Sequence, residues 1–248
     1  MNVLGIDIGG SGIKGAPVNV KTGELLAKRK RFDTPQPATP DAVADTVLRL
    51  VRHFDWDGPL GVAFPARVRR GVAETASNID KAFIGLDVDK LLEERTGLPT
   101  HVLNDADAAG VGEVHFGGGQ GVKGVVMMIT LGTGIGSGLF VDGRLVPNTE
   151  LGHVVLPGGK VAEPFAADRV RKAEKLDWKT YGKRVQKVIA YYDFLFAPDL
   201  MIVGGGVSKP ERWSEFGPLL KASCPIVPAT LKNDAGIIGA AYHSSTLK

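Results

Sequence analysis

The sequence contains a single cysteine, Cys224, among its 248 residues. An intramolecular disulfide is therefore impossible, and a zinc site built from several cysteine thiolates is excluded. The sequence also has no apolar run near the roughly 20 residues that cross a bilayer, and no charged-then-apolar leader opens it. We therefore expect a cytoplasmic protein that does not contact a membrane.

A strong excess of one charge is missing as well. The 30 Lys and Arg residues against 27 Asp and Glu give a net charge of +3, which is too small to indicate a nucleic-acid partner. The first expected strand begins at Asn2, so we expect no DNA-binding module before it. The hydrophobic content of 44% is that of an ordinary globular protein, and the length suffices for one large domain or two smaller ones.

Glycine, in contrast, is abundant, and many of the 33 glycines lie in clusters after short apolar runs. Such clusters let backbone N–H groups approach a phosphate closely and form an anion-binding nest. The first cluster, Gly9-Gly10-Ser11-Gly12, lies between Asp7, a carboxylate suited to Mg²⁺, and the cation Lys14. The alternative is a tight hairpin turn with a structural aspartate, and the spacing of a Walker loop is absent.

Two further glycine clusters follow apolar runs later in the chain. Gly132-Thr133-Gly134 forms a second candidate phosphate loop, with the threonine hydroxyl as a further donor. No helical pattern follows it, which argues against a dinucleotide-binding turn. Gly204-Gly205-Gly206 is either another nest or a flat surface for a nucleotide base. One such loop is a weak signal, whereas three at strand ends together indicate phosphate binding.

An acidic stretch, Asn104-Asp105-Ala106-Asp107, lies between a β-branched run and a segment with helical spacing. Phosphoryl transfer to a hydroxyl needs a positioned acceptor for the hydroxyl proton, and one carboxylate suffices. We take Asp105 as that general base, with Asn104 beside it orienting the acceptor. The alternative is that one of these two residues is simply the N-cap of the helix that follows.

The order of expected elements repeats along the chain. A strand, a glycine loop, a second strand, a turn and a third strand are expected over residues 2–31, with the third strand at 24–31, and again over 124–147. Strands and helices alternate elsewhere, which predicts an α/β fold, and two similar halves predict a ligand cleft between them. We expect a smaller N-terminal domain at 1–105 and a larger domain at 106–248. The C-terminal helix is a candidate for packing back onto the N-terminal domain.

Further polar residues are candidates for binding a sugar, because a polyol is recognised by fixed donors and acceptors for its hydroxyls. Glu150 and His153 bring a carboxylate and an imidazole three residues apart. A structural histidine or a metal ligand is the alternative for His153, but no cysteine or second histidine lies nearby in the sequence. The complete candidate set is Asn78, Asn104, Asp105, Glu150, His153 and Glu163.

These motifs together resemble the ROK sugar kinases, at residues 7–15, 104–109, 131–138, 149–153 and 204–208. The resemblance covers nearly the whole chain and implies two ribonuclease-H-like domains of the actin/hexokinase type that close on glucose at a central cleft. It implies that Asp105 is the base for the 6-hydroxyl of the sugar. The residues that it implies for the other hydroxyls are Asn78, Asn104, Glu150, His153 and Glu163.

The same resemblance implies phosphate binding by both of the first two glycine loops, a nucleotide on the side of Gly204 to Gly206, and Mg²⁺ as cofactor. The match is best to the branch of the family that uses inorganic polyphosphate. We therefore expect glucose 6-phosphate to be made from glucose and polyphosphate, with ATP as a second candidate donor, by a homodimer. A strictly ATP-dependent kinase of glucose, mannose or an N-acetylated sugar is the first alternative, and a non-catalytic sugar sensor is the second.

The sequence departs from the wider family in ways that affect the site. Many ROK members bind structural zinc through a cysteine cluster, but residues 154–175 contain no cysteine, so we expect no zinc, as in the polyphosphate branch. Ala66 and Ala167 stand where the resemblance leads us to expect Gly and Ser.

Three basic clusters could guide a polyphosphate chain, namely 28–31, 67–70 and 169–172. The alternative for each is a solvated face of the protein. Residues 28–31 lie in an expected strand, where alternate side chains point to opposite faces. We favour Arg67, Arg69 and Arg70, because they follow the end of a strand.

Overall fold

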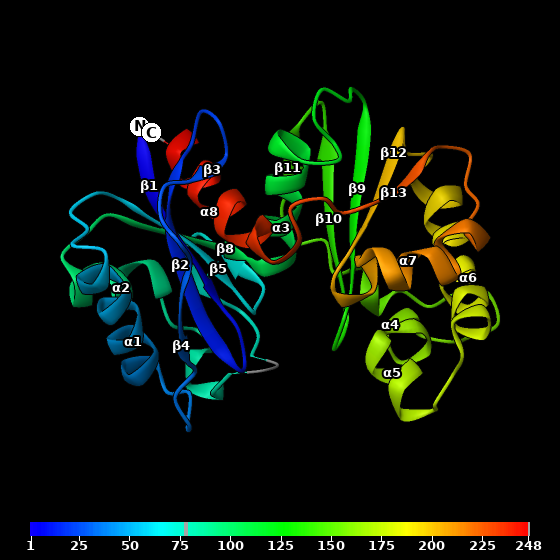
Figure 1. Cartoon of the computed structure of the whole chain (residues 1–248). Coiled ribbons are helices and arrows are strands. Elements are labelled where there is room, and N and C mark those ends of the chain that lie inside the picture. The colour runs from blue at the N-terminus through cyan, green and yellow to red at the C-terminus, as the bar shows by residue number, and fades with distance from the viewer. Residues whose placement is uncertain (77–78, 248) are drawn as a thin grey trace. The chain divides into compact units, whose positions relative to one another are not determined.

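The computed structural model describes residues 1–76 and 79–247, which form two compact units. The first unit consists of Met1–Gly112 and Asp234–Lys248, and the second unit is Glu113–Asn233. Figure 1 shows how the first unit combines both ends of the chain, with the red C-terminal helix beside the blue N-terminal strands. Within the described residues, no helix is both long and apolar enough to cross a membrane.

The first unit is built on a sheet with the strand order β3-β2-β1-β5-β8, in which β4 also pairs with β2. Its first two strands are antiparallel, and β1, β5 and β8 run parallel. The strands are β1 (Asn2–Ile8), β2 (Gly12–Asn19), β3 (Glu24–Leu25), β4 (Lys30–Asp33), β5 (Leu60–Phe64) and β8 (Thr100–Asn104), with a separate hairpin of β6 (Val68–Arg69) and β7 (Val72–Ala73).

The prediction of a single third strand at 24–31 is wrong, because two short strands, β3 and β4, form in its place. Each pairs with a different part of β2, and the residues between them leave the sheet. Pro17 lies in β2 between the two pairings and has no N–H to donate, so a continuous ladder cannot form there.

Side-chain caps define the starts of two helices of the first unit. Thr39 accepts from the backbone of Ala42 at the start of α1, and Asp87 accepts from Lys90 at the start of α2. Gly97, with φ of 73°, ends α2 in the left-handed conformation that favours glycine. The helical segments are α1 (Pro40–His53), η1 (Lys81–Phe83), α2 (Val88–Thr96), α3 (Asp105–Phe116), which continues into the second unit, and α8 (Ala235–Thr246).

The second unit repeats the strand order of the first, β11-β10-β9-β12-β13, with β9 antiparallel to β10 and parallel to β12. The predicted repetition of strand order is therefore confirmed at the level of topology, and so is the α/β fold. The strands are β9 (Val125–Leu131), β10 (Ile135–Val141), β11 (Arg144–Val146), β12 (Leu200–Gly204) and β13 (Ile226–Pro228).

The segment from Ala162 to Ala173 forms two short helices and not one continuous helix. The break falls at Ala167, whose ψ of 149° is extended. Helix α7 and strand β13 were not expected. The helical segments of the second unit are η2 (Leu151–His153), α4 (Ala162–Ala166), α5 (Asp168–Ala173), α6 (Trp178–Phe196), η3 (Gly206–Ser208), α7 (Pro210–Phe216), η4 (Gly217–Leu219) and η5 (Lys232–Asp234), which ends at the return to the first unit.

The boundary between the units falls inside α3, not after Asp105 as the sequence suggested. The first two turns of α3 pack closely on α8. A Cβ at Gly239 would collide with the carbonyl oxygen of Ala108, and a Cβ at Gly112 would lie 2.5 Å from the carbonyl oxygen of Ala235. This contact keeps the start of α3, together with α8, in the first unit.

The close approach of α3 and α8 predicts that Gly239→Ala destabilises the protein. The added methyl group has no space beside Ala108, and overpacking of this kind costs about 1–3 kcal/mol. Gly236→Ala in the same helix is the matched control, because its Cβ would meet its nearest neighbours at 3.8 Å and alanine favours the helix. Urea unfolding should give a lower midpoint for the first variant and an equal or higher one for the second. Equal midpoints for both variants would contradict the packing argument.

Candidate active site

Asp105 is the first residue of α3, directly after strand β8, and its side chain is exposed. The capping role belongs mainly to Asn104, whose amide oxygen accepts from the N–H groups of Ala106 at 2.9 Å and Asp107 at 3.1 Å. The Asn104 amide also donates to the carbonyl of Ala66 at 3.1 Å, which ties the loop after β5 to this junction. The arrangement holds a carboxylate at the carboxyl end of a parallel strand, where it can reach a ligand.

The first glycine loop is a tight turn between β1 and β2. The N–H of Gly9 donates to the carbonyl of Gly12 at 3.1 Å, and the hydroxyl of Thr34 donates to the carbonyl of Gly9. A Cβ at Gly12 would lie against the Arg31 guanidinium, the mobile end of a long side chain, so glycine at this position lets Arg31 lie directly on the turn. Neither Gly9 nor Gly12 has a positive φ. This turn therefore does not need glycine at these two positions for a left-handed backbone conformation.

Asp7 lies at the end of β1 beside this turn. Its carboxylate accepts from the Lys14 ammonium at 3.3 Å, and both side chains are partly exposed, at 23% and 28%. The predicted acidic and basic residues of the first loop are therefore neighbours. In the part of the chain that the structure describes, no three His, Cys, Asp or Glu residues are grouped as ligands for a metal ion.

The second glycine loop, between β9 and β10, is held by residues that follow it in the sequence by 28 positions, for Glu163, and by 37 positions, for Arg169. The N–H of Ile135 donates to Glu163 at 2.9 Å, and a Cβ at Gly134 would collide with the same carboxylate. The N–H of Arg169 donates to the carbonyl of Gly132 at 3.0 Å. Glu163, a predicted sugar ligand, is thus fixed against the predicted phosphate loop.

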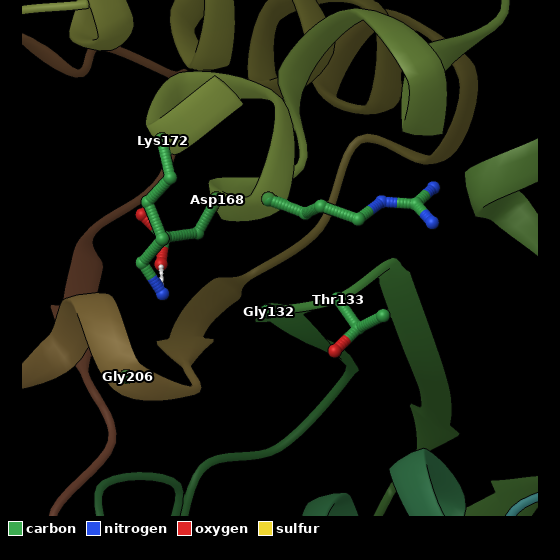
Figure 2. A pocket seen from close by; sticks show the side chains of 6 residues that line it. Gly132, Thr133, Asp168, Lys172 and Gly206 are labelled. Carbon is green, nitrogen blue, oxygen red and sulfur yellow. Dashed lines mark ion pairs between the residues drawn. The ribbon is translucent and has the colours of Figure 1, made fainter. Parts of the chain in front are cut away.

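A pocket of about 360 Å³ joins the second and third glycine loops with helix α5. Figure 2 shows Asp168 and Lys172 on one side of it and Thr133 on another, with Gly206 at the third loop. Gly205 has φ of 87° and presses against the end of β9, where a Cβ would collide with the carbonyl of Leu131. The lining residues are Gly132, Thr133, Asp168, Arg169, Lys172 and Gly206.

The charges around this pocket are dominated by cations. Asp168 is buried and accepts from Arg171 and Lys172, each at 2.7 Å. Burial alone would raise the pKa of Asp168, but the hydrogen bonds and charges of Lys172 and Arg171 outweigh it, so its pKa lies below the ordinary value. Among the described residues, the exposed Arg169 guanidinium forms no ion pair. The pocket therefore carries an excess of positive charge, which suits a phosphate ligand.

Glu150 and His153 lie together at the turn η2, with 3.9 Å between the Glu150 carboxylate and Nε2 of His153. Both side chains are exposed. Two residues that the sequence did not indicate hold this turn through Leu151: the buried Ser137 hydroxyl accepts from its N–H at 3.1 Å, and the Tyr192 hydroxyl donates to its carbonyl at 2.7 Å. Ser137 lies in a glycine-rich stretch that was noted, whereas nothing in the local sequence indicates Tyr192.

The favoured basic cluster is less available to a ligand than the sequence suggested. Arg67 and Arg69 both pair with Glu74 across the β6–β7 hairpin, at 2.7 Å and 3.1 Å. Arg169 and Lys172, from the cluster that was not favoured, line the pocket beside Gly132. Asn78, a predicted sugar ligand, lies outside the described residues.

The ROK family model matches residues 3–170. The chain belongs to the ROK family. It is 48% identical over 245 residues to a polyphosphate glucokinase of Mycobacterium tuberculosis, covering 97% of this chain and 90% of the relative.

Solved structures agree with this assignment. An inorganic polyphosphate/ATP-glucomannokinase of Arthrobacter sp. strain KM is 47% identical with a TM-score of 0.91, and 98% of each chain is covered. A ROK family glucokinase of Streptomyces griseus, solved with glucose and AMPPNP, is 25% identical with a TM-score of 0.82, covering 97% of this chain and 98% of that one. The actin/hexokinase-like fold of both domains is therefore confirmed.

The buried pairing of Asp168 predicts a pH-dependent effect of Asp168→Asn. A carboxylate with a lowered pKa in the folded state stabilises it above the ordinary value of 3.8, and this contribution is lost as the pH falls through the lowered pKa. At pH 7 the variant should lose about 1–3 kcal/mol of unfolding free energy, as expected for hydrogen bonds to a charged group. The difference in unfolding free energy between the variant and wild type should become smaller below about pH 4.

Glu174→Gln is the matched control, since Glu174 is exposed and pairs with a single arginine, Arg184. Its loss at pH 7 should be smaller than that of Asp168→Asn. Denaturant titrations at several pH values measure both variants. A difference for Asp168→Asn that stays constant between pH 7 and pH 3 would exclude the ion pairs as its cause.

Proposed function

We propose that this protein phosphorylates glucose at the 6-hydroxyl with inorganic polyphosphate as donor, giving glucose 6-phosphate. The observation that carries the proposal is the cation-rich pocket of about 360 Å³ against the second glycine loop, in a chain that is 48% identical to a polyphosphate glucokinase. The glucomannokinase that is 47% identical uses polyphosphate or ATP, which supports ATP as a second donor.

On the acceptor side, Asp105 is the general base. Its carboxylate accepts the proton of the 6-hydroxyl while the oxygen forms a bond to the terminal phosphorus of the donor. The bond from that phosphorus to the bridging oxygen breaks, and polyphosphate leaves one unit shorter. The other hydroxyls are held by Asn78, Asn104, Glu150, His153 and Glu163.

On the donor side, we assign the transferred phosphate and its neighbours to the pocket of about 360 Å³ that Gly132, Thr133 and Arg169 line. We call it the donor pocket. The N–H groups of Thr133 and Gly134 and the Thr133 hydroxyl donate to the phosphate oxygens, and Arg169 and Lys172 neutralise their charge. A nucleotide donor would extend toward Gly204–Gly206. The turn from Gly9 to Gly12, with Ser11 and Lys14, contacts phosphate from the first unit.

Mg²⁺ is the cofactor that we propose. This ion is commonly held by one or two carboxylates together with the phosphates of the substrate, so Asp7 meets the requirement without a cluster of ligands. When bound, Mg²⁺ neutralises charge on the transferring phosphoryl group. Without a ligand, the Lys14 ammonium neutralises the charge of the Asp7 carboxylate. When phosphate and Mg²⁺ bind, Asp7 would hold the ion and Lys14 would contact the phosphate.

We further propose that the protein is a cytoplasmic homodimer. Its single cysteine suits a reducing compartment, where disulfides are rare. Self-association is supported by the adjacent residues Phe194 and Leu195 at the end of α6, which are 82% and 44% exposed, because contiguous exposed apolar surface marks interaction sites.

A comparison of donors tests the proposed reaction. Purified protein is incubated with glucose, Mg²⁺ and either long-chain polyphosphate or ATP, and glucose 6-phosphate is measured. We expect product from polyphosphate at a rate that falls when Mg²⁺ is omitted. Product from ATP alone would refute polyphosphate as donor and support the strictly ATP-dependent alternative, and no product with either would support a sugar sensor.

Asp105→Asn tests the base. The amide is nearly isosteric but cannot accept the proton, and loss of a positioned base costs about 10²- to 10⁴-fold in rate. Glucose binding, measured by calorimetry, should persist. Asp41→Asn, which also removes an exposed carboxylate from the first turn of a helix, should leave kcat unchanged. A kcat for Asp105→Asn within a few-fold of wild type would exclude this residue as the base.

A further inference from the structure

The positive charge of this protein is concentrated in one segment of the second unit. Residues 160–187 contain nine Lys and Arg against four Asp and Glu, a net charge of +5, whereas the whole chain has a net charge of only +3. The remainder of the chain is therefore slightly acidic. The segment comprises α4, α5 and the first half of α6, and includes two residues that line the donor pocket, Arg169 and Lys172.

A second pocket, of about 290 Å³, lies within the same segment, between α4 and α6. Three cations surround the ring of Phe165 beside it: Lys160 at 4.9 Å, Arg184 at 5.3 Å and Lys187 at 5.9 Å from the ring centre. The spacing of Arg184 and Lys187 places them on one face of α6. The residues that line the pocket are Lys160, Val161, Pro164, Phe165, Glu174 and Arg184.

These cations are incompletely balanced by the protein. Glu174 accepts from Arg184 at 2.5 Å, and this hydrogen bond, with the nearby charges of Arg184 and Lys160, lowers the pKa of Glu174. Lys160 and Lys187 form no ion pair with the described residues. Three like charges around one ring repel each other, and a bound polyanion would relieve that repulsion.

Helix α5 connects the two pockets. Arg169 and Lys172 line the donor pocket, and Glu174, directly after the helix, lines the second pocket. Glu174 is five positions after Arg169, which corresponds to about 8 Å along a helix. A linear anion that leaves the first pocket along α5 would therefore reach the second within a short distance.

We propose that Lys160, Arg184 and Lys187, together with α5, form a basic track that binds the part of a long polyphosphate chain beyond the donor pocket. Each further phosphate of the chain carries negative charge, so a chain that reaches the track gains contacts that ATP or a short phosphate cannot make. The track rests on the proposed function, since it requires polyphosphate as donor. It gives the enzyme a preference for long chains.

The test is the double variant Lys160→Gln with Lys187→Gln. Both side chains are exposed, so the fold should tolerate the change. The KM for long-chain polyphosphate should rise roughly three- to tenfold, the range expected when two screened surface ion pairs are lost. The KM values for tripolyphosphate and ATP should stay unchanged, because these donors end within the first pocket.

The matched control removes the same charge elsewhere, through Lys21→Gln with Lys123→Gln. Lys21 lies in the turn after β2, and Lys123 precedes β9 at the end opposite to Gly132, and both are exposed. The control should keep the wild-type KM for every donor. Binding of long-chain polyphosphate in the absence of glucose can be measured by the fluorescence anisotropy of a labelled chain. This binding should weaken only in the track variant.

The outcomes separate the two proposals. If wild type transfers phosphate from tripolyphosphate and from long chains, but the track variant and the control behave alike, the track is refuted and the proposed function stands. If wild type transfers from neither polyphosphate, the proposed function fails and the track fails with it. A loss with tripolyphosphate as large as with long chains would also refute the track, because the lysines would then act in the donor pocket.

Discussion

The second glycine loop depends on two contacts made by the chain after η2. Glu163 accepts from the N–H of Ile135, and the N–H of Arg169 donates to the carbonyl of Gly132. Because Gly134 has no side chain, the carboxylate can lie directly against the loop. These contacts fix α5 over Gly132, and the donor pocket, its cations and the adjoining basic track all follow from that placement.

Local patterns in the sequence predicted much of the fold. Apolar runs followed by glycine clusters located β1, β9 and β12, and the repeated order of strands appears in both sheets. The junction at Asn104 and Asp105 was also located correctly, since a strand followed by a helical pattern is a local signal. Asn104 caps α3, as the alternative interpretation predicted, and Asp105 presents an exposed carboxylate, so its role as the general base stays a prediction. The interruption of the third strand opposite Pro17 was missed, because it depends on pairing between strands.

The parts of the site that the sequence could not predict are set by contacts between distant residues. Arg67 and Arg69 gave a promising basic cluster, but the β6–β7 hairpin brings Glu74 to both of them. Tyr192 supports the turn of Glu150 and His153 from 41 positions away, and no local pattern marks it. Arg169 comes to line the pocket only because α5 lies on the glycine loop, which no local pattern in the sequence indicates.

The most direct test is to locate the backbone groups that a donor phosphate contacts when it binds. Amide chemical shifts of ¹⁵N-labelled protein, titrated with tripolyphosphate and Mg²⁺, report contacts at each backbone N–H. We expect saturable shifts at the N–H groups of Thr133 and Gly134 that weaken in Arg169→Ala. Shifts confined to residues 28–31 or 67–70, with none at the second glycine loop, would contradict this expectation.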